Sequence, residues 1–169
     1  MALIIETGAG LPDADSYVSL ADARDLAAKY GMMLPGDDTE AEAALRNGAL
    51  YVGLQEPQMC GKRVSAEQSL AYPRTGVTLY GNPVPSDSIP KQVIQAQLIA
   101  AVEYGKGTDV RGYNDGRITS MERVEGAVTV QYFNNGSNGS SGVITAAIDA
   151  LRPLLCGMNN GFEFRVYRG

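Results

Sequence analysis

Apolar residues recur at helical spacing in three long stretches of the chain. These stretches cover residues 19–30, 39–54 and 90–104. Ser19 has a side chain that favours a helix start, and Gly31 is typical of a helix end. Thr39 and Glu42 have the spacing of a capping box, and Pro90 suits a first turn because that turn needs no amide hydrogen there. The pattern predicts three helices.

The third stretch differs from the other two because it is apolar on nearly all sides between residues 93 and 102. A helix of this kind is buried, so we expect it at the centre of a bundle with the other two helices packed on it. Farther along, residues 118–124 and 128–133 alternate apolar and polar side chains around a short turn, which predicts a β-hairpin over about residues 117–133. A lone hairpin is marginal in water, so it requires a partner surface.

The last part of the chain changes composition. Residues 134–142 contain only asparagine, glycine and serine, which is typical of a flexible linker. Residues 143–151 have helical spacing, and Pro153 ends that pattern. The interpretation is a mainly α fold with a small β component: a bundle of three to four helices in residues 1–133 with its hairpin, then the linker, then a flexible C-terminal helix and docking tail over residues 143–169.

Residues 65–76 form the most informative local motif. Ser65 and Gln68 have capping-box spacing, which predicts a short helical turn, and the chain then breaks at Tyr72 and Pro73. Arg74 would follow on a fixed turn. The segment is therefore either an ordinary helix–loop junction with a solvated arginine or a docking loop.

Composition excludes several classes of function. The 169 residues are 44% hydrophobic, enough for one domain with a core, and no apolar run approaches the ~20 residues of a membrane span. Cys60 and Cys156 have no metal-ligand spacing and are interpreted as two reduced thiols. The chain has no histidine, no nucleophile elbow and no P-loop. We therefore expect no enzyme, no catalytic residues, no metal and no cofactor.

Charge bears on possible partners. Fourteen basic residues against nineteen acidic ones give a formal net charge of −5, and the basic residues are scattered. Proteins that bind nucleic acid tightly concentrate lysine and arginine on one face. An acidic surface would instead let DNA pass without adhesion.

Several blocks together resemble a known family. They are residues 1–10, 14–19, 42–51, 65–76, 89–90 and 151–155. The chain is similar in these blocks to the head–tail connector proteins of tailed phages, which genomes also describe as DnaT-like single-stranded-DNA-binding proteins. The resemblance implies a structural virion protein at the head–tail interface, present in the host cytoplasm during assembly. It would form a homo-oligomeric ring of twelve copies between the portal protein and a neck or tail-completion protein, and DNA would pass its channel without specific binding.

Two groups of contact residues follow from this reading. The predicted portal-binding residues are Leu151, Leu154, Leu155, Phe162, Phe164, Arg165, Tyr167 and Arg168. The predicted subunit-interface residues are Tyr72, Pro73, Arg74, Thr75, Ile118, Val124, Val128 and Val130.

The alternative function is that of a DnaT-like replication accessory protein that binds single-stranded DNA. In that case Arg63, Arg74 and Lys91 would contact phosphate, and Tyr72 or Tyr80 would stack on bases. Binding would then depend on salt, whereas a connector would bind little DNA. A third class, a small-molecule enzyme, would require a pocket beside Glu122.

Overall fold

The computed structural model describes residues 2–107 and 142–156 of the chain. Its helices are α1 (Leu20–Lys29), α2 (Asp38–Leu54), α3 (Lys91–Gly105) and α4 (Gly142–Leu151), with the 3-10 turns η1 (Glu56–Gln58) and η2 (Arg152–Leu154). Two antiparallel pairs of short strands join β1 (Lys62–Arg63) to β2 (Arg74–Thr75) and β3 (Thr78–Leu79) to β4 (Asn82–Pro83). The fold is mainly α with a small β component, as the sequence predicts.

The helix starts follow local capping chemistry. At α1 the Ser19 hydroxyl accepts a hydrogen bond from the Asp22 amide at 3.1 Å, as predicted. The predicted start of α2 at Thr39 is wrong, because the Asp37 carboxylate accepts from the amides of Thr39 and Glu40. Aspartate is a better N-cap than threonine and comes earlier in the chain, so the helix begins at Asp38.

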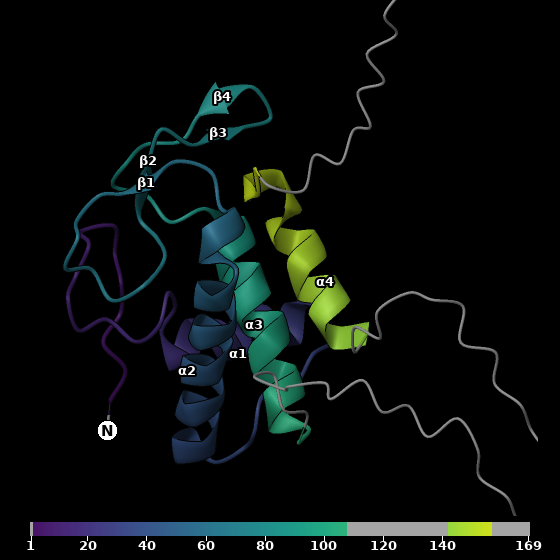
Figure 1. Ribbon diagram of the computed structural model, residues 1–169. Coiled ribbons are helices and arrows are strands. Elements are labelled where there is room, and N and C mark those ends of the chain that lie inside the picture. The colour runs from purple at the N-terminus through teal and green to yellow at the C-terminus, as the bar shows by residue number, and fades with distance from the viewer. Residues whose placement is uncertain (1, 108–141, 157–169) are drawn as a thin grey trace, which may run out of the picture.

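Helix α3 lies between α2 and α4 (Figure 1). Its side chains Val93, Leu98 and Ala101 are fully buried, which confirms the central position that its apolar sequence predicts. Helix α2 approaches it closely at Gly48, where a Cβ atom would stand 2.3 Å from the Gln97 carbonyl oxygen. Only glycine allows this contact between the two backbones.

One buried polar side chain joins three parts of the core. Gln97 on α3 donates hydrogen bonds to the Ser16 hydroxyl at 2.8 Å and to the Leu45 carbonyl at 2.9 Å. Its carbonyl oxygen accepts from the Tyr17 amide at 3.1 Å. A buried amide is tolerated when its polar atoms are paired, and here the pairing fixes the N-terminal segment against α2 and α3.

The expected apolar docking patch at residues 151–155 is not free. Helix α4 packs on α3, and Leu151, Leu154 and Leu155 are buried in the same core as Tyr72 and Val93. The interpretation of these leucines as exposed docking residues is therefore wrong, because the bundle itself covers them. Helix α4 therefore shares a core with α2 and α3.

The prediction of two reduced thiols is also wrong, because Cys60 and Cys156 form a disulfide with their Cα atoms 5.0 Å apart. A short antiparallel bridge brings them together: the Cys60 amide donates to the Leu154 carbonyl, and the Cys156 amide donates to the Gln58 carbonyl. The pair is 96 positions apart in the chain, so sequence spacing carried no sign of this proximity.

Several predictions fall outside the described residues. They concern the hairpin at about residues 117–133 with Ile118, Val124, Val128 and Val130, the linker up to residue 141, and the tail residues Phe162, Phe164, Arg165, Tyr167 and Arg168. Within the described part of the chain, no helix is long and apolar enough to cross a membrane.

Candidate nucleic-acid interface

Arg74 is buried rather than presented on a turn. It is 6% exposed, and its guanidinium donates to the carbonyl oxygens of Cys60 at 2.8 Å and Gly61 at 2.9 Å. It also donates to the Ala71 carbonyl and, at 3.0 Å, to the Glu56 carboxylate. The expectation of a solvated or docking arginine is therefore wrong, since the side chain holds the surrounding loops together.

Arg63 shares the same carboxylate. Its Nε and Nη2 atoms donate to the two Glu56 oxygens at 2.6 and 2.5 Å, and its Nη1 donates to the Gln68 carbonyl at 2.6 Å. The hydrogen bonds from Arg63, with a smaller contribution from Arg74, hold the pKa of Glu56 below its usual value although burial opposes this. The same bonds raise the pKa of Arg63. Neither arginine is left for a phosphate, so the prediction that Arg63 and Arg74 contact DNA phosphates is wrong.

The short helical turn predicted at Ser65 is wrong, although one half of the expected Ser65–Gln68 pairing is present. The Gln68 carbonyl oxygen accepts from the amides of Val64 and Ser65, and the Ser65 hydroxyl accepts from the Glu67 amide. The Gln68 amide group reaches across the loop to the carbonyl oxygens of Leu70 and Pro73. Gln68 therefore organises a loop, and the backbone of residues 65–70 stays outside helical geometry.

The aromatic–proline step after this loop enters the core. Tyr72 and Pro73 are joined by a cis peptide bond, and both are buried. The Tyr72 amide donates to the Tyr17 hydroxyl at 3.2 Å. Of the four subunit-interface residues predicted here, Thr75 alone is exposed, and Tyr72 cannot stack on a base.

Replacing Tyr72 by phenylalanine is expected to leave the protein as stable or to raise its free energy of unfolding by about 1 kcal/mol. Burial raises the pKa of Tyr72 to about 12, and its hydroxyl oxygen is buried without a hydrogen-bond partner in the described part of the chain. Urea denaturation followed by circular dichroism measures the change. Tyr17→Phe is the control, because it removes a hydroxyl that is paired and is expected to destabilise. A clear loss of stability in Tyr72→Phe would contradict this account.

Tyr80 is the aromatic side chain that the fold displays. It stands with Gly81 at the tip of the β3–β4 hairpin, with φ angles of 51° and 83°, the left-handed pair that tight hairpins require. Its ring is 75% exposed, whereas Leu79 beside it packs on the core. The hairpin lies at the end of the bundle near η2 (Figure 1).

The part of the chain around this hairpin is close to neutral, in contrast to the acidic residues before it. Residues 56–91 contain four basic residues against three acidic ones, whereas residues 2–55 contain three basic against nine acidic. Lys62 on β1 and Lys91 at the start of α3 are exposed, and neither has an ion-pair partner among the described residues. We call Tyr80, Lys62 and Lys91 the hairpin surface.

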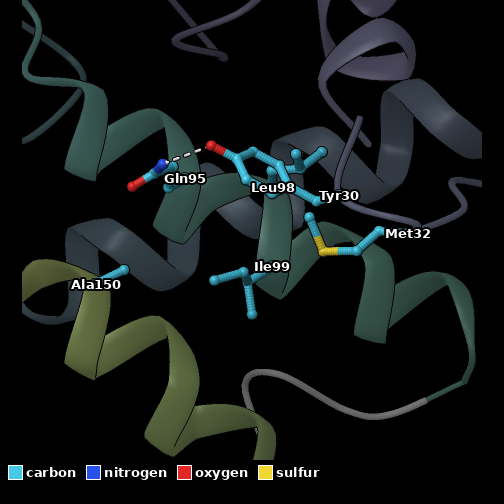
Figure 2. A pocket seen from close by; sticks show the side chains of 6 residues that line it. All are labelled: Tyr30, Met32, Gln95, Leu98, Ile99 and Ala150. Atoms are coloured by element: carbon cyan, nitrogen blue, oxygen red, sulfur yellow. Dashed lines mark hydrogen bonds between the residues drawn. The ribbon is translucent and has the colours of Figure 1, made fainter. Parts of the chain in front are cut away.

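A groove lies beside α3, between the residues that follow α1 and helix α4 (Figure 2). This Tyr30 groove has a volume of about 250 Å³ and is lined by Tyr30, Met32, Gln95, Leu98, Ile99 and Ala150. The Gln95 amide donates to the Tyr30 hydroxyl at 3.2 Å, and the rest of the lining is apolar.

A second hollow, of about 440 Å³, lies between α2 and residues 69–71. Its two arginines are already paired, Arg46 with Asp15 at 2.7 Å and Arg63 with Glu56 at 2.5 Å. It is therefore a poor site for an anion. No group of three metal-binding side chains occurs among residues 2–107 and 142–156.

A family model described as "Putative DnaT-like ssDNA binding protein" matches residues 1–169. The chain belongs to this family. No curated protein and no solved structure matches it.

Membership of the DnaT-like family corrects the identification as a head–tail connector. The matching description is of a single-stranded-DNA-binding protein. The predictions of a connector function, of a structural virion protein, of portal and neck partners in a ring of twelve, and of DNA passing without binding are therefore wrong. The resemblance rested on blocks such as residues 65–76, and the structure uses that block for internal packing through Gln68, Tyr72 and Arg74. Similarity in such a block indicates a shared fold. It is no evidence for a partner in a virion.

Proposed function

We propose that this protein binds single-stranded DNA through the hairpin surface. The observation that carries the proposal is the match of the DnaT-like family over the whole chain. The structure supports a location for the interface, since Tyr80 is the most exposed aromatic ring of the described residues and Lys62 and Lys91 lie at the same end of the bundle.

The chemistry of this surface favours unpaired bases. A tyrosine ring stacks on any base face, and lysine ammonium groups contact phosphate. The chain carries a net charge of −5, so stacking has to supply much of the affinity. Two lysine contacts correspond to a slope of about −1.4 when the logarithm of the binding constant is plotted against the logarithm of salt concentration.

Tyr80→Ala is expected to weaken binding of an oligothymidylate about 5- to 150-fold, the effect of losing one base-stacking ring. Fluorescence anisotropy of a labelled oligonucleotide at low salt measures it. Tyr80→Phe keeps the ring and is expected to bind like the parent protein. Lys62→Gln is expected to make the salt slope about 0.7 shallower, since one phosphate contact is lost.

The matched charge control is Lys106→Gln, because Lys106 lies at the other end of α3 and is held by Glu103 at 2.6 Å. It is expected to leave both affinity and salt slope unchanged. Absence of binding to single-stranded DNA at low salt would overturn the function. Equal binding by Tyr80→Ala and Tyr80→Phe would overturn its placement on the hairpin surface.

A further inference from the structure

The Tyr30 groove lies along α3 from Lys91, the residue of the hairpin surface at the start of that helix. Lys91, Gln95 and Ile99 are spaced four residues apart, so they lie on one stripe of the helix. Each step along the stripe advances about 6 Å along the helix axis. A strand held at Lys91 would therefore reach the groove one helical turn later.

The lining of the groove suits a flat ring with polar edges. The Tyr30 ring is 56% exposed and lies along α3, with its hydroxyl directed at Gln95 (Figure 2). Met32, Leu98 and Ile99 supply an apolar floor. The Gln95 carbonyl oxygen makes no hydrogen bond within the described part of the chain, so one acceptor remains beside the Tyr30 hydroxyl. An amide side chain matches the donor and acceptor groups on a base edge.

Charge around the groove favours a ligand with a negative backbone. Lys29 precedes Tyr30 and Lys91 lies on the approach; both are exposed, and neither has an ion-pair partner among residues 2–107 and 142–156. Asp149, next to the lining residue Ala150, is neutralised by Arg152 at 2.7 Å. A purely apolar peptide would leave both lysines unused.

We propose that the Tyr30 groove takes one unpaired base of a bound DNA strand, stacked on Tyr30 with its edge against Gln95. This inference rests on the proposed function and adds a second contact site to it. Lys29 and Lys91 would hold the phosphates on either side of that base. A duplex, whose bases are already paired, could not insert one.

The chain contains no tryptophan, so Tyr30→Trp introduces a single tryptophan in the groove, and Tyr80→Trp introduces one on the hairpin surface; each can be excited selectively over the tyrosines. Adding an oligothymidylate is expected to quench the emission of both variants. An oligonucleotide of the same length made of abasic sugar-phosphate is expected to quench neither. Tyr30→Ala and Gln95→Ala are expected to weaken binding, by about 5- to 150-fold for the ring. Both positions are on the surface, and far-UV circular dichroism checks that the variants fold.

The outcomes separate the two proposals. If Tyr80→Trp responds to DNA while Tyr30→Trp stays unchanged at saturation, the base site in the groove is wrong and the DNA-binding function stands. If the parent protein causes no change in the anisotropy of the labelled oligonucleotide, both proposals are wrong. Equal quenching of Tyr30→Trp by the abasic strand, or quenching by an apolar peptide that DNA does not displace, would also overturn the base site.

Discussion

Breaking the Cys60–Cys156 disulfide is expected to lower the free energy of unfolding by about 3–5 kcal/mol. The bond joins residues 96 positions apart, and closing so long a loop restricts the unfolded chain strongly. The folded chain loses little, because the backbone hydrogen bonds from Cys60 to Leu154 and from Cys156 to Gln58 remain. Urea denaturation of the oxidised protein with and without reductant measures the difference.

The double variant Cys60→Ser, Cys156→Ser is the control for this experiment. It is expected to unfold at the same urea concentration as the reduced parent protein, and reductant is expected to leave its urea midpoint unchanged. Its far-UV circular dichroism before unfolding is expected to match that of the parent, since Leu154 and Leu155 stay packed in the core. Equal midpoints for the oxidised and reduced parent protein would contradict the stabilising role of the bond.

The helices of this fold were predictable because their signals are local. Ser19, Gly31 and Pro90 act within one turn of the backbone. The apolar run of α3 predicts a buried helix from its own residues alone. The one shifted boundary, at Asp37, came from two candidate caps two residues apart. Local chemistry offers both, and only the structure shows which carboxylate or hydroxyl meets the amides.

The site was far less predictable because it depends on distant contacts. From sequence, Arg74 is expected at the surface. Its partners, Glu56 and the carbonyl oxygens of Cys60 and Gly61, become neighbours only in the folded structure. Tyr30 and Gln95 are 65 positions apart and meet only after α1 folds against α3. The exposure of Lys91 and Tyr80 could be predicted from sequence, since a helix start and a glycine-containing turn are local features that place side chains at the surface.

The ion pairs of Glu56 with Arg63 and Arg74 also predict how the free energy of unfolding depends on pH in acid. Arg63 and Arg74 hold the pKa of Glu56 below its ordinary value of 4.5, so the ionised carboxylate is favoured by folding. This contribution is fully present above pH 4.5 and is lost as the pH falls through the lowered pKa of the folded state. Glu56→Gln removes it at every pH.

Arg74→Met is expected to lower the free energy of unfolding by about 3–5 kcal/mol, the usual result of deleting one partner of a buried ion pair. The substitution leaves the carbonyl oxygens of Cys60, Gly61 and Ala71 without their donor in the interior. Arg74→Lys keeps the charge but lacks the planar fork that reaches several acceptors, so it is expected to recover only part of the loss. Urea denaturation at neutral pH measures all three proteins.

Arg63→Met is the matched control, because it removes the other guanidinium from the same carboxylate. The Arg63 side chain is 33% exposed against 7% for Arg74, so water can replace some of its hydrogen bonds, and the expected loss is smaller, about 1–2 kcal/mol. Equal losses in the two variants would mean that the carboxylate pairing decides stability. A larger loss in Arg74→Met would assign the difference to the carbonyl oxygens of Cys60, Gly61 and Ala71, which Arg74 binds and Arg63 does not.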